Sequence, residues 1–414
     1  MGRTRLDALL ADLEVLYPGA RVSTASGAGA GAPGMRRFRL LVSRRHPRLL
    51  VPVDSPEATR AAIRRDSAND RLHDVLGRRA VAAVAGHRLG QRVFRDVVTA
   101  GPVGADSVET YLARFVGDAV RLSLHSGAAR ANAKPVVGVH LTTGAEIGFC
   151  KIGITPLAAR LVAHESSGLR LLAAAHLTSL DVPAVLHAGQ WRGHEVLLMG
   201  ALRGSRGRGR LVPVEAMREV VQALGTAVCS LRDSPWTARI GEQLPGAGPE
   251  VAARIRWTLD ALVTRHGDQP LVHGGCHGDW GPWNMSWSGD RPLVWDWERF
   301  TRDTPAGVDA AHFTAHVRLR RIGDLPLAMS AVHDAEEAVR AVLAPWSSAH
   351  ASEAAGRTVV MAYLVDLATR LAIDAGDAGT ALVGRMADWY LEVAARRLQL
   401  ASTPDEVSES DAAA

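Results

Sequence analysis

The chain has 414 residues, of which 47% are hydrophobic and 22% charged, a composition typical of a globular protein with two or three folded units. A formal net charge of +5 and a pI near 9.5 are too modest to favour nucleic-acid binding, and no apolar run reaches the roughly 18 residues of a membrane span. Three scattered cysteines and an N-terminus without an apolar signal segment favour the cytoplasm.

The first hundred residues predict an α/β segment that carries no recognisable chemistry. Its hydrophobic periodicity alternates between helical and strand patterns, separated by glycine-rich and basic turns. The expected elements are a helix at 4–16, a flexible low-complexity loop at 23–34, strands at 38–42 and 49–53 joined by the basic turn 44–48, and a helix at 55–87 with Ser55 as a possible N-cap.

From about residue 108 the pattern becomes rich in strands. Turn residues at 142–145 predict a hairpin, and Pro156 predicts the first turn of a helix that begins near Thr155. Beyond Leu211 the chain is mainly helical apart from a motif-rich stretch, and the acidic tail at 402–414 predicts disorder. The expected strands lie at 119–124, 135–141, 147–152, 184–190 and 194–199.

The residues that carry chemistry are concentrated at 271–300. His277-Gly-Asp279-Trp-Gly-Pro-Trp-Asn284 is followed by an apolar strand that ends in Asp296. Phosphoryl transfer to a hydroxyl needs one carboxylate that takes the proton, and an amide oxygen and a second carboxylate that hold Mg²⁺. The spacing D-x4-N, with an aspartate at the end of the next strand, supplies these groups.

This pattern resembles the catalytic loop and metal-binding segment of the aminoglycoside phosphotransferase and choline kinase family, a branch of the protein-kinase-like superfamily. The resemblance rests on H-G-D-x4-N followed by Asp296-Trp-Glu298. It implies that Asp279 is the catalytic base, that His277 supports the loop, and that Asn284 and Asp296 are the metal ligands. The later Asp309 matches a structural aspartate of the family that braces the loop.

The resemblance covers roughly 110–400 and implies an α+β, bilobal protein-kinase-like fold. Residues 108–200 then form a small antiparallel-sheet lobe with one helix, and 201–401 form a mainly helical large lobe that carries the catalytic and metal-binding segments. Residues 1–107 are an extra N-terminal α/β segment. ATP, with GTP as an open alternative, and Mg²⁺ are the implied cofactors, and the nucleotide is expected between the lobes.

The two lysines of the chain offer an independent test. Of 48 Lys and Arg residues, only Lys134 and Lys151 are lysines. In a chain biased toward arginine, a lysine is retained where a compact ammonium is required, because the planar fork of arginine does not fill the same space. Kinase-like folds pair a strand lysine with a glutamate on the next helix, and Lys151 and Glu165 match those positions.

Two further nucleotide contacts are implied by position. Lys134 lies between the first two strands of the small lobe, where the family has its nucleotide-covering loop; a simple exposed loop is the alternative. Met199 and Ala201 follow the fifth strand and match the interlobe hinge, whose backbone binds adenine in the family.

Three other patterns have both functional and structural interpretations. Four arginines at 203–210 contact an anionic substrate or RNA, or form a solvated linker. His273, Cys276 and His277 are too close in sequence for an ordinary zinc site. Five of the ten tryptophans lie between 280 and 297, where they pack in the core or stack on a sugar.

The sequence therefore predicts an ATP- and Mg²⁺-dependent phosphotransferase that acts on the hydroxyl of a sugar, an aminoglycoside or a related metabolite. It predicts neither a membrane nor a nucleic-acid partner. A protein Ser/Thr kinase is the first alternative, but no activation segment follows Asp296. A nucleotide-binding pseudokinase is the second, but every catalytic position is filled. The motifs do not specify the acceptor, the oligomeric state or the role of 1–107.

Overall fold

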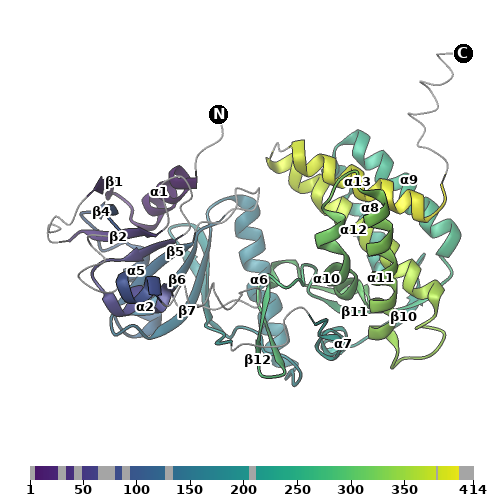
Figure 1. The fold of residues 1–414 in the computed structure, drawn as a ribbon, viewed down its shortest axis with the longest axis horizontal. Helices are drawn as coiled ribbons and strands as arrows, with labels where there is room; N and C mark the ends of the chain where they lie inside the picture. Colours follow the sequence, from purple (N-terminus) through teal and green to yellow (C-terminus); the bar gives the residue numbers. More distant parts are fainter. Residues whose placement is uncertain are drawn as a thin grey trace, which may run out of the picture. The chain divides into compact units, whose positions relative to one another are not determined.

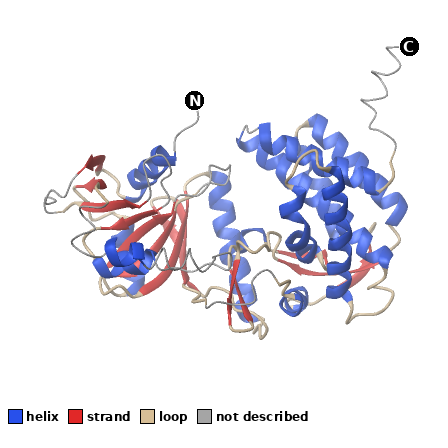
Figure 2. Cartoon of the chain, in the orientation of Figure 1, coloured by secondary structure: helices blue, strands red, loops and turns tan. Residues whose placement is uncertain are grey.

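The computed structural model describes residues 5–26, 34–41, 49–63, 80–85, 94–125, 134–204, 211–378 and 381–400. The chain forms two compact units (Figure 1). Unit 1 comprises Met1–Arg170, Val182–Gly209 and Ser286–Glu298; unit 2 comprises Leu171–Asp181, Arg210–Met285 and Arg299–Ala414. Strands are concentrated in unit 1 and helices in unit 2 (Figure 2), which confirms the expected α+β class.

Unit 1 is built on a nine-stranded sheet in the order β1-β4-β2-β3-β5-β6-β7-β9-β8, in which all paired neighbours are antiparallel. The five strands β5 to β9 are those expected for the small lobe. Alternating branched apolar residues bury one face of these strands against the core. The strands are β1 Arg21–Ser26, β2 Arg36–Leu41, β3 Leu49–Pro52, β4 Asp96–Gly101, β5 Val120–His125, β6 Val136–Leu141, β7 Glu146–Gly153, β8 Val185–Trp191 and β9 His194–Gly200.

The N-terminal segment is continuous with this sheet, because β3 pairs with β5. The sequence expected a loop from residue 23, but β1 extends to Ser26 and pairs with β4 along its whole length. Strand β4 and helix α5 were not expected. Residues 27–33 of that loop, the turn 44–48, residues 64–79 and 86–87 of the expected helix, and the tail 402–414 lie outside the described residues. The helices here are α1 Arg5–Leu16, α2 Pro56–Ile63 and α5 Val108–Val116, and 80–85 is also helical.

Helix α6, Pro156–Ala174, begins where the sequence placed its start. The Thr155 hydroxyl accepts a hydrogen bond from the Ala158 N–H at 3.2 Å. Proline is tolerated at Pro156 because an N–H in the first turn of a helix has no acceptor within the helix. Gly153 ends β7, and a Cβ at this glycine would lie 2.5 Å from the Ala159 Cα. Glycine therefore allows the strand and the helix to approach closely at this corner.

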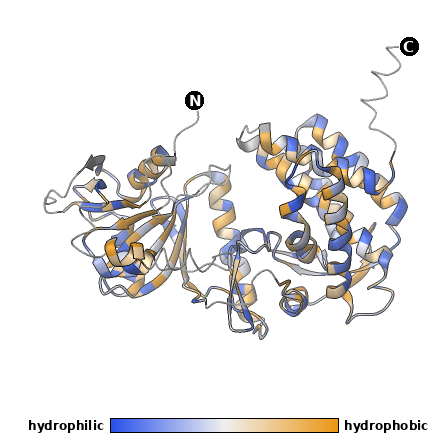
Figure 3. Ribbon diagram, in the orientation of Figure 1, coloured by the Kyte–Doolittle hydropathy of each residue, from blue (hydrophilic) through white to orange (hydrophobic). Residues whose placement is uncertain are grey.

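Unit 2 is mainly helical, with one small sheet of order β10-β11-β14. Its helices show both hydrophobic and hydrophilic segments (Figure 3), the amphipathic pattern that buries one stripe in a shared core. None of the described helices is both long and apolar enough to cross a membrane. The elements are α7 Val214–Gln222, β10 Ala227–Ser230, α8 Pro235–Gln243, the 3₁₀ helix Leu244–Ala247, α9 Pro249–His266, β11 Pro270–Cys276, β14 Thr301–Pro305, α10 Val308–Leu319, α11 Leu325–Leu343, α12 Glu353–Ala378 and α13 Ala381–Arg397.

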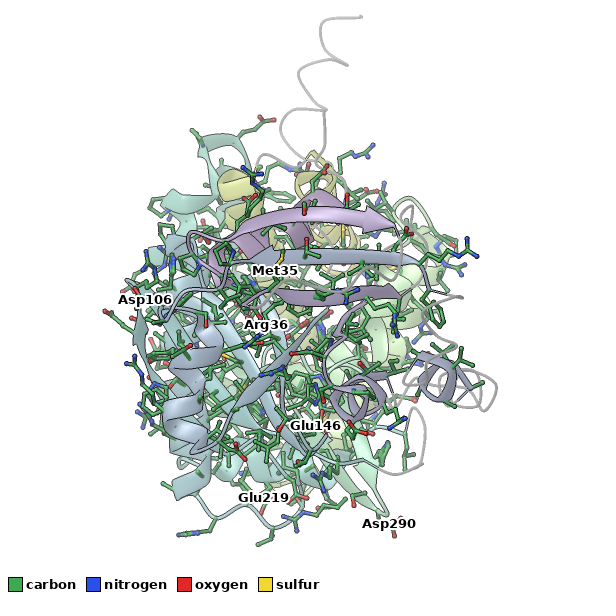
Figure 4. All side chains as sticks on the ribbon, turned by 90° about the vertical axis from the view of Figure 1, so that its left-hand side faces the viewer. Met35, Arg36, Asp106, Glu146, Glu219 and Asp290 are labelled. Carbon is green, nitrogen blue, oxygen red and sulfur yellow. The ribbon has the colours of Figure 1, made fainter. Side chains whose placement is uncertain are left out.

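A buried polar cluster joins α1, β2 and α5 in unit 1. The Tyr17 hydroxyl donates to Glu109 Oε1 at 2.9 Å, and Arg36 Nε lies 2.5 Å from Glu109 Oε2. Arg36 is labelled in Figure 4. The Glu109 side chain is only 5% exposed. Burial raises the pKa of Glu109, but Arg36 and Tyr17 oppose this shift. The carboxylate is thus the shared acceptor that fixes both helices against the sheet.

We expect Glu109→Ala to destabilise the protein by about 3 kcal/mol, because it leaves a largely buried guanidinium without its partner. Tyr17→Phe removes one hydrogen bond and should cost only about 1 kcal/mol. Urea denaturation followed by circular dichroism measures both. Equal losses for the two variants would contradict the central place of Glu109.

Candidate active site

Lys151 lies at the centre of a charged network in unit 1. Its ammonium, on β7, donates to Glu165 Oε1 at 2.7 Å and Oε2 at 2.6 Å, so the ion pair that the spacing predicts with helix α6 is present. The ammonium also donates to Asp296 Oδ1 at 2.5 Å. Burial alone would lower the pKa of Lys151, but Asp296, Glu165 and Glu298 outweigh it and raise the pKa above its usual range. The lysine is therefore charged although it is buried.

Asp296 follows a two-stranded hairpin, β12 Met285–Ser288 and β13 Arg291–Val294, whose turn contains Asp290 (Figure 4). Its φ of 72° lies in the left-handed region, which costs a residue with a Cβ about 1–3 kcal/mol. Glu165 Oε1 also accepts the Trp297 N–H at 3.1 Å. The same glutamate thus holds both the lysine and the backbone beside Asp296.

The second lysine joins the same network. Lys134 forms an ion pair with Glu298 Oε2, and each of these side chains is only 7% exposed. The simple exposed loop that the sequence left open for Lys134 is therefore wrong at this residue. Its neighbours 126–133, including Arg130, lie outside the described residues. Both lysines of the chain are bound to carboxylates of one cluster.

The carboxylates of this cluster have the composition of a hard-cation site. Oxygens of Glu165, Asp296 and Glu298 lie within 4.8 Å of one another. Mg²⁺ favours oxygen ligands from one or two carboxylates together with water and phosphate oxygens. The donor set therefore fits Mg²⁺, and it includes Asp296, which the motif predicts as a ligand. Asn284, the other expected ligand, belongs to unit 2.

The motif loop of unit 2 is held by the start of helix α10. Asp309 accepts the His277 N–H at 2.8 Å and the Gly278 N–H at 2.9 Å, and the Gly278 carbonyl accepts from Arg370 Nη1 at 2.6 Å. Gly278 has φ +80°, and a Cβ there would lie 2.6 Å from the Arg299 carbonyl oxygen. His277 is fully buried, and its Nδ1 accepts the Asp279 N–H at 3.2 Å. The bracing expected of Asp309 and His277 is present.

Asp279 and Asn284 contact each other inside this loop. Asn284 Nδ2 donates to the Asp279 carbonyl at 2.9 Å and to Asp279 Oδ2 at 3.0 Å, which directs Asn284 Oδ1 away from Asp279. His312 Nε2 on α10 lies 3.1 Å from Asp279 Oδ1. Burial would raise the pKa of Asp279, but His312 and Arg370 hold it well below its usual range. Asp279 is therefore ionised at neutral pH.

At the end of β9, where the resemblance places adenine, one backbone N–H is already used in a hydrogen bond to β7. The Ala201 N–H donates to the Ile147 carbonyl at 3.1 Å, and Met199 is 4% exposed within β9. A base at this strand end would use carbonyl acceptors rather than the Ala201 N–H. Of the arginine run, 205–210 lies outside the described residues.

Two groups at this site were not assigned from the sequence. Arg370 and His312 contact the loop from α12 and α10, and no local motif marks either of them. Trp280, Trp287 and Trp297 are buried core residues, whereas Trp283 is half-buried. Among the described residues, no metal-binding group includes His273 or Cys276.

No protein-family model and no curated protein sequence matches the chain. Three similar solved structures have TM-scores below 0.5. The aminoglycoside phosphotransferase APH(4)-Ia has a TM-score of 0.47 at 15% identity, with 72% of this chain and 100% of that chain covered. Plasmodium vivax ethanolamine kinase has a TM-score of 0.45 at 8% identity, with 82% of this chain and 93% of that chain covered. A choline/ethanolamine kinase family protein of Mesorhizobium loti has a TM-score of 0.41 at 18% identity, with 67% of this chain and 88% of that chain covered.

We expect Lys134→Met and Glu298→Gln each to destabilise the protein by about 3 kcal/mol, because each breaks a buried ion pair by removing one of its two charges. The double variant should lose less than the sum, with a coupling energy above about 1 kcal/mol. Urea denaturation of the four proteins measures this cycle.

The exposed pair Arg232 and Asp268 serves as the matched control, with side chains 48% and 93% exposed. The cycle Arg232→Gln and Asp268→Asn should give a coupling of no more than about 0.5 kcal/mol. Equal coupling in the two cycles would contradict a buried role for Lys134.

Proposed function

We propose that the protein is an ATP- and Mg²⁺-dependent phosphotransferase that moves the γ-phosphoryl group to a hydroxyl of a small molecule. The observation that carries this proposal is the buried Lys151, bound at once to Glu165 and to an Asp296 held in left-handed backbone. A buried ammonium between two carboxylates is costly to assemble. Such an arrangement is expected where the lysine must meet the phosphates of a nucleotide.

Each residue of the network has a role in binding the nucleotide. Lys151 contacts phosphate oxygens, and Glu165 orients its ammonium. Asp296 would hold Mg²⁺, whose chemistry when bound is to neutralise charge on the phosphates. Asn284 is the second ligand that the motif predicts. Lys134, which pairs with Glu298, is assigned as a second positive charge that faces the phosphates. Backbone carbonyls at Met199 and Ala201 are assigned to the adenine.

Asp279 is assigned the role of base. Its Oδ2 is bound by Asn284 and its Oδ1 lies against His312, so the orientation of the carboxylate is fixed. The acceptor O–H bond breaks as its proton passes to Asp279, and the acceptor oxygen forms a bond to the γ-phosphorus. The bond between the γ-phosphorus and the bridging oxygen breaks, and ADP leaves. A carboxylate that stays ionised at neutral pH can receive this proton.

We expect Asp279→Ala to lower acceptor-dependent ADP release by at least about 100-fold while nucleotide binding is retained, because general-base catalysis contributes about 10²–10⁴-fold. ADP release is measured with ATP and Mg²⁺ over a panel of sugars, aminoglycosides and amino alcohols, and nucleotide binding is measured by calorimetry.

Asp260→Asn is the control, since Asp260 is an exposed aspartate on α9 in the same unit. It should leave both quantities unchanged. Turnover that survives Asp279→Ala would exclude Asp279 as the base. Failure of the wild-type protein to bind ATP would refute the phosphotransferase proposal.

A further inference from the structure

An aromatic cluster, defined here as Trp283, His312, His316 and Tyr363, surrounds Asp279 in unit 2. The rings of His312 and His316 stack with centroids 4.4 Å apart, one turn apart on α10. Trp283 contacts both, with centroids at 5.7 Å and 5.4 Å, and Tyr363 of α12 meets His312 edge-on at 5.7 Å. The elements that carry this cluster, α10 and α12, are labelled in Figure 1.

Part of this cluster is exposed beside the base. Asp279, Trp283 and His316 are half-buried, whereas His312 and Tyr363 are only 1% and 2% exposed. A flat aromatic face next to a fixed carboxylate can stack on the apolar face of a sugar ring while a ring hydroxyl reaches the carboxylate. The proposed base thus lies next to a surface that suits a polyhydroxylated molecule.

The cluster also contains unused hydrogen-bonding capacity. His312 Nδ1, His316 Nδ1 and Tyr363 Oη are buried, and none of them has a hydrogen-bond partner among the described residues. Buried polar atoms without partners cost about 1–3 kcal/mol each, so such atoms gather where a polar ligand binds. These ring nitrogens and the phenol oxygen can hydrogen-bond to the hydroxyls of a ligand.

The charges around Asp279 argue against a polycation. Asp366 and Asp374 lie near Arg370 on α12, but they already pair with Arg239 and Arg299 at 3.3 Å and 2.9 Å. Asp309 is occupied by the backbone N–H groups of the motif loop. Asp279 is therefore the one carboxylate facing this cluster that is not already taken by an arginine or by N–H groups of the loop, within the described residues of unit 2.

Two arginines lie close to the aromatic cluster. The positive charges of Arg370 and Arg320 both act to lower the pKa of His316 and of Tyr390, so a polyamine would meet repulsion beside Asp279. Burial, followed by His312, lowers the pKa of His316 to about 2, so that ring is neutral at physiological pH. A neutral ring packs against an uncharged ligand without a desolvation penalty for charge.

We propose that the aromatic cluster is the acceptor-binding surface and that the acceptor is an uncharged, polyhydroxylated, sugar-like molecule rather than a polycationic aminoglycoside. This inference rests on the proposed phosphotransferase function and names the substrate class of that same site. Trp283 and His316 supply the exposed contact, and His312 and Tyr363 supply polar atoms behind it.

The test compares D-glucose, N-acetyl-D-glucosamine and maltose with kanamycin and choline as acceptors, using ADP release by the full-length protein with ATP and Mg²⁺. At least one neutral sugar should stimulate ADP release at least 10-fold more than kanamycin or choline. A preference for kanamycin or choline would overturn the inference and leave the phosphotransferase proposal standing. ATP binding without turnover on any of these acceptors would overturn the inference, and absence of ATP binding would overturn both.

Variants locate the surface. Trp283→Ala and His316→Ala should raise the KM for the neutral sugar at least 10-fold while the KM for ATP stays within 2-fold, and Trp283→Phe should recover most of the loss. Trp257→Phe, a half-buried tryptophan on α9, is the matched control and should change neither. An unchanged sugar KM in both alanine variants, or a parallel rise in both KM values, would contradict binding at the aromatic cluster.

Discussion

The buried ammonium of Lys151 is the constraint on which the site of unit 1 depends. It connects β7 to a glutamate 14 residues further along the chain and to an aspartate 145 residues away. An uncompensated buried charge costs several kcal/mol, so none of these three segments can move without loss to the others. The left-handed backbone of Asp296 is tolerated for the same reason, since the surrounding bonds determine it.

Both lysines of this arginine-rich chain belong to one cluster of ion pairs. Lys134 pairs with Glu298, and Lys151 pairs with Glu165 and Asp296, so two amines meet three carboxyl groups. A compact ammonium can give up one carboxylate for a phosphate oxygen with little rearrangement, whereas a guanidinium bound in a bidentate fork cannot. The cluster thus combines oxygen donors for a hard cation with positive charges for phosphate.

The parts that could be predicted from the sequence are those set by short-range spacing. The D-x4-N loop, the Lys151–Glu165 pair and the hairpins β5–β6, β6–β7 and β8–β9 depend on neighbours within about 20 residues, and local patterns reveal them. The sequence predicts a loop for residues 23–26 of β1, because the partner strand β4 lies at least 70 residues away. Arg370 reaches the Gly278 carbonyl across 92 residues, and only the packing of α12 against the loop makes that contact.

The same distinction explains why the motif does not reveal the acceptor. The loop from His277 to Asn284 carries the proposed base, and its backbone is held by Asp309. The groups proposed to face the acceptor come mainly from an i, i+4 pair on α10 and from α12, which lie outside the motif. In this chain α10 and α12 present aromatic and imidazole rings and Arg370 around Asp279. The proposal of a sugar-like rather than a cationic acceptor therefore rests on these side chains and not on the catalytic motif.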